Sequence, residues 1–459
     1  MINVSQDTKN AYMSDVSNKT LRVVFPELNL TYYNNNIEVE SLKLTESISS
    51  KDSVEFVGCI ASSFEISIYN IQAEIKNRRI LVYITCDNTE EIPLFNGIVD
   101  SVVIDSTKNY KKITAFDELY TKGNVELTGW YNSEFPTLES TKTIKELRDS
   151  LFDYVGLEQV ETELCNDDIL IGTIFDTKTL KSSSVMKSIC QFNGCCGIIN
   201  RYGKFEYRYI KSISEGTFPA ATLFPSNKTH PSVNNLAHTL AFYENLKFQE
   251  YYVKPMKRVQ FRKDENDTGI TVGSESGNKY IIQSNMFAQG LDEIQLKSAA
   301  ENILNKLKST AFYPCETKNN GLPFVEVGDG IKYVLASSRT GRYATSCFIV
   351  LTRTLSGIQL LKDNFSASGN EEQSEFITDL QTQIDTIKMN GASGDTYTKE
   401  EIDTKLEDYA SLEEMSYEVT EQVSQMEVPT GFNVVSCYEL PASRQANTLY
   451  LVQGMVIML

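Results

Sequence analysis

Two histidines and nine cysteines are the residues of this 459-residue chain that would matter most for catalysis or metal binding. His230 and His238 are eight residues apart, and together with a carboxylate they formally suffice for a zinc site. No HExxH sequence accompanies them, so we interpret both as satisfied polar or surface histidines. The sequence also lacks a Gly-x-Ser-x-Gly nucleophile turn and a glycine loop that would cradle phosphate. We therefore expect no catalytic residue, no metal site and no cofactor.

The cysteines are scattered along the chain and form no CxxC pair, which argues against a zinc ribbon or a disulfide framework. Most of them have apolar neighbours, so buried free thiols and folding in a reducing compartment are expected. Cys195 and Cys196 are the one unusual pair, directly after Asn193 and Gly194. A Cys/His hydrolase would use Cys196 with His238. The simpler interpretation of the pair is a strand with one cysteine facing inward and one outward.

The net charge of −18 is distributed unevenly. Residues 371–430 contain 16 acidic residues and 3 lysines, so this stretch carries −13 of the total. An acidic chain has little to offer a phosphate backbone, which argues against nucleic-acid binding. No uncharged apolar run approaches the roughly 20 residues of a transmembrane helix. The first seven residues lack the basic and apolar regions of a signal peptide.

Short alternating segments predict β-strands between residues 20 and 120. Phe64, Ile66 and Ile68 alternate with polar residues and are expected on one face of a strand. The other strands expected in this region are 21–25, 37–44, 80–84, 94–99, 102–104 and 110–116, with a turn at 107–109. Such a series is typical of an antiparallel barrel or sandwich.

Helical patterns appear between residues 140 and 210. Thr143 and Glu146 form a capping-box pattern that predicts the start of a helix. A second helix is expected to end at Asn193-Gly194, and a hairpin is expected to turn at Arg201-Tyr202-Gly203. Residues 235–370 return to strands around one helix with an apolar stripe at Leu296, Ala300, Ile303 and Leu307. The strands expected there are 251–253, 258–261, 331–334, 347–351 and 358–360.

The acidic stretch has a narrow apolar seam at coiled-coil spacing. A helix with such a seam cannot bury it alone, so we expect self-association through it in preference to packing on the body of the chain. A break at Gly391-Ala392-Ser393-Gly394 separates the first helix from the second. The apolar positions of the seam are Ile377, Leu380, Ile384, Ile387, Ile402, Leu406, Tyr409, Leu412, Met415, Val419, Val423 and Met426.

These patterns predict a multidomain, mainly β protein with an α+β insert and two antiparallel β-barrel-like domains, followed by coiled-coil-like helices and a small C-terminal β-module. The expected domains are a first β-barrel at 1–125, the α+β insert at 126–230, a second β-barrel with one helix at 231–370, the acidic coiled-coil-like segment at 371–429 and the β-module at 430–459.

Several motifs, taken in order, resemble phage tail hub proteins. Residues 94–99 followed by 113–117 resemble the first hub barrel, in which a strand with Phe-x-Gly precedes a strand ending in Asp. Residues 42–62 are similar to the opening of prophage tail proteins of Gram-positive bacteria. Residues 325–331, with Val-Gly-Asp, resemble the second barrel. Residues 397–406 resemble a helix start common in tail and fibre proteins.

The resemblance implies a non-enzymatic homotrimer at a virion tail tip, made in the bacterial host cytoplasm. Two barrels in each of three chains would match a sixfold distal tail protein ring to a threefold fibre or receptor-binding part. A hub of this kind closes the tail tube and opens for DNA, which passes without specific binding because an acidic lumen repels it. A tape-measure protein and a tail fibre protein are further partners that the family implies, and no membrane segment is expected.

Two other function classes stay open at this stage. Many tail-tip hubs carry a cell-wall hydrolase, which here would have to use His238 or Cys196. A receptor- or glycan-binding module is the third class, at residues 431–459, with Tyr438 and Tyr450 as stacking aromatic residues. A small trimeric plug or fibre adaptor is the interpretation that we favour for that segment.

Overall fold

The computed structural model comprises two compact units, Met1–Gly391 and Ala392–Leu459. No helix in the part of the chain that the structure describes is both long enough and apolar enough to cross a membrane. The structure describes residues 2–14, 17–38, 40–49, 58–107, 109–137, 139–172, 180–210, 213–217, 229–233, 238–240, 244–263, 267–336, 343–371, 433–437, 448–452 and 455–458.

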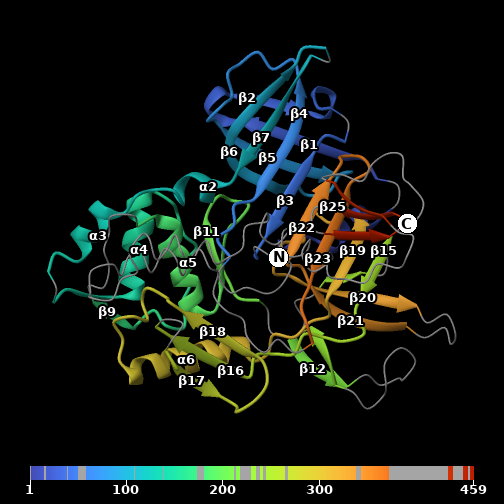
Figure 1. Cartoon of the computed structure of the whole chain (residues 1–459). Coiled ribbons are helices and arrows are strands. Elements are labelled where there is room, and N and C mark those ends of the chain that lie inside the picture. The colour runs from blue at the N-terminus through green and yellow to red at the C-terminus, as the bar shows by residue number, and fades with distance from the viewer. Residues whose placement is uncertain are drawn as a thin grey trace. The chain divides into compact units, whose positions relative to one another are not determined.

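An antiparallel sheet of eleven strands is the largest element of the first unit (Figure 1). The strand order is β15-β19-β23-β22-β3-β4-β7-β6-β5-β1-β2, so β15 and β2 are its edges and the described strands form no closed barrel. The mainly β character predicted from the sequence is confirmed. The strands are β1 (Lys19–Phe25), β2 (Leu30–Tyr33), β3 (Lys43–Ser47), β4 (Ser63–Tyr69), β5 (Arg79–Cys86), β6 (Ile92–Asp105), β7 (Tyr110–Phe116), β15 (Asn245–Phe248), β19 (Cys315–Asn320), β22 (Thr352–Ser356) and β23 (Lys362–Ala367).

Alternation places the apolar residues of β4 in the core. Phe64, Ile66 and Ile68 are all fully buried, as predicted, and Phe64 stacks on Phe95 with ring centroids 5.1 Å apart. Strand β6 is one strand of 14 residues where the sequence pattern predicted two. Its pairing with β7 shifts register between Val99 and Ser101. The strand continues past this irregularity, but the inward and outward alternation of its side chains is shifted by one residue.

The two β regions meet in the middle of this sheet. Strand β3 pairs antiparallel with β22, with Leu44 opposite Leu355, so strands from residues 19–116 and from 245–367 share one ladder of hydrogen bonds. This joining was not predicted, because the pairing links segments about 300 residues apart and no local pattern encodes it. The five expected domains stay predictions.

The helices confirm their sequence signals. Thr143 and Glu146 cap each other at the start of α4, and Gly194 ends α5 in a left-handed conformation with φ of 63°. Leu296, Ala300, Ile303 and Leu307 are all buried on α6, as their spacing predicted. The helices are α1 (Gln6–Met13), α2 (Glu118–Lys122), α3 (Thr128–Glu134), α4 (Ile144–Val155), α5 (Ser182–Asn193) and α6 (Glu293–Leu307), with 3-10 turns η1 (Pro26–Leu28) and η2 (Asn34–Asn36).

Smaller sheets complete the first unit. The hairpin predicted to turn at Arg201-Tyr202-Gly203 is present as β10 (Cys196–Ile199) and β11 (Phe205–Arg208). Figure 1 shows α3, α4 and α5 in the green segment that leads into this hairpin. The remaining sheets are β8 (Thr141–Thr143) with β9 (Leu170–Gly172); β12 (Ile213–Thr217) with β13 (Thr229–Val233); β14 (His238–Leu240), β20 (Gly330–Ala336) and β21 (Tyr343–Ile349); and β16 (Arg258–Arg262), β17 (Ile270–Gly273) and β18 (Lys279–Gln283).

The second unit contains one described sheet of three strands. Strand β24 (Asn433–Cys437) pairs parallel with β25 (Thr448–Val452), which pairs antiparallel with β26 (Met455–Met458). The two strands expected on either side of Gln453-Gly454 correspond to β25 and β26.

Three predicted strands differ from the structure. Residues 251–253 make only an isolated bridge, Val253 to Phe312. Residues 358–360 are a turn between β22 and β23, because Gly357 is left-handed and Glu40 accepts from the backbone N–H groups of Ile358 and Leu360. In the segment 37–44, Ile37 makes a bridge to Ile68 and β3 begins only at Lys43.

Candidate functional site

The most elaborate constellation of charged residues lies inside the first unit, where the two β regions join. Arg353 of β22 is fully buried, and all five of its N–H groups have acceptors. Its Nε and Nη2 donate to the two carboxylate oxygens of Asp363 at 2.9 and 2.7 Å. Its Nη1 donates to Glu46 of β3 at 3.0 Å. Arg353 therefore connects three neighbouring strands, because Asp363 lies on β23.

Backbone carbonyls of the segment 321–329 complete the shell of Arg353. Nη1 donates to the carbonyl of Val325 at 2.5 Å, and Nη2 donates to that of Leu322 at 3.0 Å. Asp363 in turn accepts from the backbone N–H of Leu322 at 3.2 Å. A segment without strand pairing is thus held by a buried guanidinium, which adds a second donor to the carbonyls of Leu322 and Val325.

Two more arginines reach the same segment from the β10–β11 hairpin. Arg201 donates to the carbonyls of Pro323 and Val325 and lies 3.5 Å from Glu46. Arg208 donates to the carbonyl of Val327 at 2.6 Å and lies 3.5 Å from Glu326. We call Arg201, Arg208, Arg353, Glu46, Glu326 and Asp363 the arginine network.

Two opposing effects set the pKa values in the network: burial disfavours the charged form of each side chain, and oppositely charged partners favour it. Burial alone would lower the pKa of Arg353, but Asp363 and Glu46 outweigh it and raise the pKa. Burial alone would raise the pKa of Glu326, but Arg208 and Arg201 lower it to about 2. Glu326 is therefore ionised at neutral pH, and its charge compensates that of a buried arginine.

The Val-Gly-Asp motif has a structural role in this network. Gly328 has a φ of +87°, and a Cβ there would lie 2.9 Å from Cδ of Arg208. Asp329 accepts from the backbone N–H of Glu326 at 3.0 Å, which closes the turn. The glycine thus permits both the turn and the close packing of an arginine against it.

The arrangement can fasten segments together. Its three arginines and three carboxylates contact one another and backbone carbonyls, and among these groups Nε of Arg201 is a buried donor without a hydrogen-bond partner in the structure. Among the residues that the structure describes, no group of three or more His, Cys, Asp or Glu is arranged to hold a metal ion.

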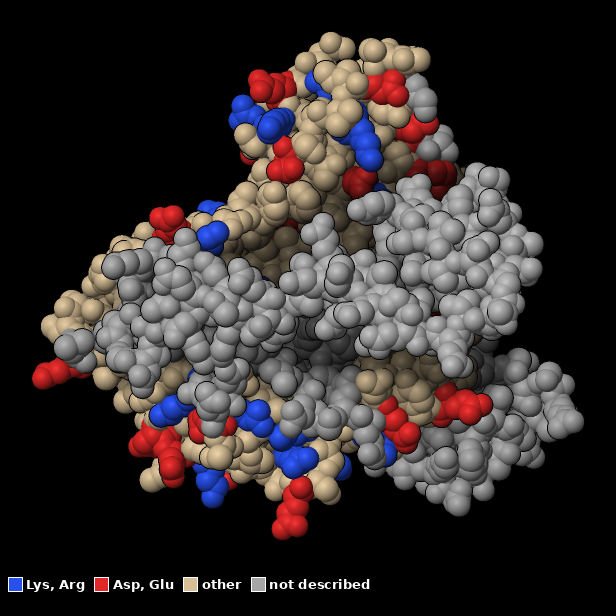
Figure 2. Space-filling view, viewed as in Figure 1, with Lys and Arg blue, Asp and Glu red and all other residues tan. Residues whose placement is uncertain are grey.

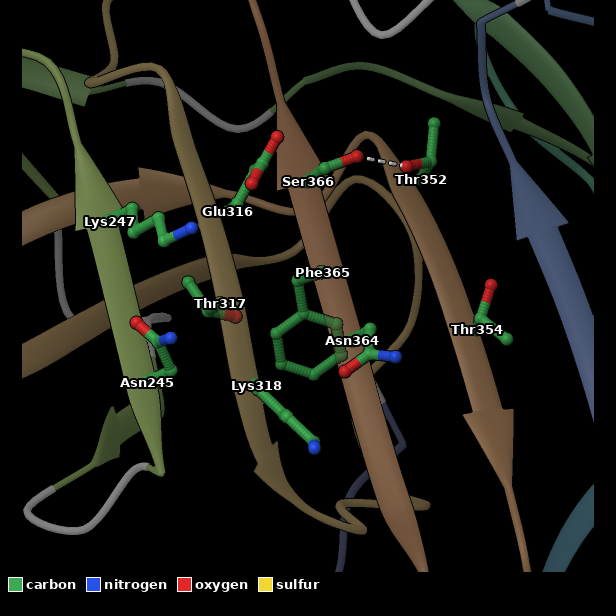
Figure 3. Close-up of a pocket in the computed structure, with 10 residues that line it drawn as sticks. All are labelled: Asn245, Lys247, Glu316, Thr317, Lys318, Thr352, Thr354, Asn364, Phe365 and Ser366. Carbon is green, nitrogen blue, oxygen red and sulfur yellow. Dashed lines mark hydrogen bonds between the residues drawn. The ribbon is translucent and has the colours of Figure 1, made fainter. Parts of the chain in front are cut away.

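A second candidate is a shallow polar depression of about 330 Å³ on the face of β15, β19, β23 and β22. Figure 3 shows the side chains that line it, with Thr352 hydrogen-bonded to Ser366 at 2.5 Å. Amides, hydroxyls and ammonium groups can donate hydrogen bonds there, but no nucleophile–base pair is present among the lining residues. They are Asn245, Lys247, Glu316, Thr317, Lys318, Thr352, Thr354, Asn364, Phe365 and Ser366.

The histidines and the Cys195-Cys196 pair singled out from the sequence belong to different elements of the structure. His230 lies in β13 and His238 in β14, strands of two different sheets. Cys195 and Cys196 are both buried, so the interpretation of one inward and one outward cysteine is wrong. The reason is that Cys195 precedes β10 and turns back to donate its thiol to the carbonyl of Cys190 at 3.6 Å.

The predicted self-association seam lies outside the described residues, from Ile377 to Met426, as does Tyr438. Tyr450 lies in β25. The seam and the binding-module interpretation therefore stay predictions.

Sequence reasoning missed the arginine network, although one signal for it exists. In Thr352-Arg353-Thr354-Leu355, the strand period places Arg353 on the same face as Leu355, which is buried. An arginine on the apolar face of a strand predicts a buried charge that needs partners. Of its partners, Asp363 is ten residues away on the next strand, whereas Glu46 is 307 residues away and leaves no local signal.

Surface charge is mixed on the face that Figure 2 shows. Lys and Arg are interspersed with Asp and Glu over the described surface, and neither sign forms a continuous patch there.

No protein-family model matches this sequence, and no curated protein matches it either. Solved structures similar to the chain include the 43 kDa tail protein of prophage MuSo2 from Shewanella oneidensis, at 8% identity and a TM-score of 0.44, covering 76% of this chain and 98% of that one. A tail protein from Neisseria meningitidis has 10% identity and a TM-score of 0.44, with 77% and 97% covered. Prophage tail protein gp18 from Listeria monocytogenes has 9% identity and a TM-score of 0.43, with 80% and 98% covered. All three are tail proteins, the class that the sequence motifs of this chain resemble.

Proposed function

We propose that this chain is a non-enzymatic structural hub of a bacteriophage tail tip. The observation that carries the proposal is the joining of the two β regions in which the hub-like motifs lie. The motif at 94–117 lies mostly in β6 and β7 of the large sheet, whereas residues 325–331 lead past the arginine network into β20 of a separate three-stranded sheet. The β3–β22 ladder joins the two halves of the large sheet, and the arginine network ties the segment 321–329 to that junction.

Two β regions joined in this way would suit a hub protein that has to resist mechanical force. A hub that closes a tail tube has to keep its two halves in register while neighbouring proteins pull on it. A buried ion network opposes sliding, because any shift leaves charges without partners at low dielectric. In this proposal the strands of 1–125 and 231–370 form the two barrel-like halves that the sequence predicted.

The assembly that we propose is a homotrimer held in part by the seam from Ile377 to Met426. Three chains with two halves each would present six similar surfaces to a distal tail ring and three to a fibre or receptor-binding part. The lumen would open for DNA without binding it specifically. A tape-measure protein would be a further neighbour.

An electron-microscopy reconstruction of the particle tests this proposal, because position in a tail defines role, stoichiometry and partners together. We expect three copies at the tip between the tail tube and the receptor-binding parts. Finding the chain elsewhere in the particle, or in a number that is not a multiple of three, would overturn the proposal. Clearing of a cell-wall zymogram that is lost in His238→Ala or Cys196→Ala would support a hydrolase instead.

A further inference from the structure

Two cysteines from distant parts of the chain have adjacent sulfur atoms. Sγ of Cys59 lies 3.8 Å from Sγ of Cys190, although 131 residues separate them. Cys59 precedes β4 of the large sheet, and Cys190 lies in α5 of the insert. A disulfide needs the two sulfurs at about 2 Å, so a modest approach of the two side chains would suffice.

Local backbone structure fixes the position of Cys59. Its N–H donates to the carbonyl of Gly197 at 2.7 Å, and Gly58 makes a parallel bridge with the same glycine. Gly58 and Cys59 both have positive φ, at 51° and 55°. A Cβ at position 197 would meet Sγ of Cys59 at 2.7 Å, so the missing side chain of Gly197 makes room for the thiol beside α5.

The two thiols differ in access. Cys59 is partly exposed, whereas Cys190 is fully buried. Burial raises the pKa of the Cys190 thiol, which keeps it protonated and slow to react with small reagents. Cys195 also contacts Cys190, but it is buried as well and lacks the access that Cys59 has. A small oxidant will therefore meet Cys59 before it meets Cys190 or Cys195.

We propose that Cys59 and Cys190 are a modification site at which a small-molecule disulfide produces an intramolecular disulfide bond. The thiolate of Cys59 attacks one sulfur of the oxidant and forms a mixed disulfide with it, while the other half of the oxidant leaves as a thiolate that takes up a proton. The Cys190 thiol then loses its proton to water and attacks Sγ of Cys59, releasing the second half as a thiol. Two protein thiols are oxidised to one disulfide, and one small disulfide is reduced to two thiols.

The bond would fasten the large sheet directly to the insert. It would close a loop of 131 residues, and long loops gain most from such a link in the chain-entropy view. The chain would fold with free thiols under reducing conditions and be covalently linked once it meets an oxidising environment. This inference is independent of the proposed hub function.

The test uses the full chain, reduced and then treated with oxidised glutathione. Remaining thiols are blocked with N-ethylmaleimide in denaturant, counted by intact mass and located by fragment ions. We expect seven of the nine thiols to be blocked, with Cys59 linked to Cys190. The melting temperature should rise by roughly 5 °C over the reduced chain.

Variants separate this pair from its neighbours. Cys59→Ser should abolish the link, and Cys190→Ala should trap a stable glutathione adduct on Cys59. Cys195→Ala and the distant Cys86→Ala should oxidise as the unaltered chain does. The proposal is overturned if the unaltered chain keeps nine blockable thiols, if it keeps a stable glutathione adduct on Cys59, or if the link joins Cys190 to Cys195.

Discussion

The two halves of the eleven-stranded sheet have similar strands and different interiors. In the half from β1 to β7, the inward side chains are mostly apolar, as at Leu21, Phe64 and Ile80, which are all fully buried, with Asp117 as a buried carboxyl at the end of β7. In the half with β19, β22 and β23, buried polar side chains stand beside the apolar ones. Arg353 and Asp363 form an ion pair there.

The difference shows which kind of interaction determines the geometry of each half. An apolar interior is non-directional, so it tolerates small rearrangements at moderate cost. A buried ion network is directional, and it is stable only while every member has its partners. The network lies where β3 meets β22, so the strictest geometry is found at the junction of the halves.

Removing one member of the network should have the largest effect. Arg353→Met keeps most of the volume but leaves Asp363 and Glu46 without their main partner in the core. We expect a loss of about 3–5 kcal/mol in the free energy of unfolding. The control Arg22→Met removes the partly exposed pair with Glu91, and it should cost about 1 kcal/mol or less. Denaturant unfolding of both variants measures the contrast, and equal costs would contradict the distinction between the halves.

The two halves should respond to pH in opposite directions. The pKa of Glu326 is about 2 in the folded chain against 4.5 as its ordinary value, so its contribution is complete above pH 4.5 and is lost as pH falls toward 2. Burial raises the pKa of Asp117, at the end of β7, from 3.8 to about 7, so its contribution is lost as pH rises from 4 to 7. Each contribution is of the order of 3 kcal/mol.

Stability measured against pH tests both windows. Glu326→Gln should flatten the curve below pH 4.5, and Asp117→Asn should flatten it between pH 4 and 7. Identical curves for the two variants would show that neither group is titrating as described.

Strain at the Val-Gly-Asp turn should be the next largest effect. Gly328→Ala places a Cβ at positive φ against Arg208, and we expect a cost of about 2 kcal/mol. Gly129→Ala in α3 is the matched control, since its Cβ would meet only the Tyr154 hydroxyl at 3.7 Å. That control should be neutral or slightly stabilising by thermal unfolding. A neutral Gly328→Ala would mean that the turn can relax without disturbing Arg208.

A small volume change in the apolar half should have the smallest effect. Ile66→Val removes one methylene group from the core of β4, and we expect a loss of about 1 kcal/mol that does not vary with pH. Unfolding at pH 4 and at pH 8 checks both parts of this prediction. A strong pH dependence of the cost would show that the packing of Ile66 is coupled to ionisable groups.

Sequence patterns predicted correctly the helix caps and the strand alternation, which depend on interactions between residues close in sequence. The capping box of Thr143 and Glu146, the cap at Gly194 and the alternation of Phe64, Ile66 and Ile68 depend on residues within a few positions of one another. The strand expected at 358–360 is wrong because two backbone N–H groups there bind Glu40, 318 and 320 residues away in sequence. The error at Cys195-Cys196 has a local cause instead, because Cys195 donates to the carbonyl of Cys190 only five residues away.

In the arginine network, too, the feature formed by neighbouring residues was recognisable from the sequence and the long-range contacts were not. The Gly-Asp turn near 328 was recognisable, whereas its arginine partners come from a hairpin more than 100 residues earlier. The pairing of Arg353 with Glu46 spans 307 residues, and only the inward register of Arg353 hinted at it.

The mass of the full chain in solution tests the central claim most directly. A trimeric hub predicts three times the 51.8 kDa of one chain, reduced to a single chain by Ile384→Asp combined with Leu406→Asp in the predicted seam. A monomer whose double variant behaves in the same way as the unaltered chain would contradict the trimeric hub.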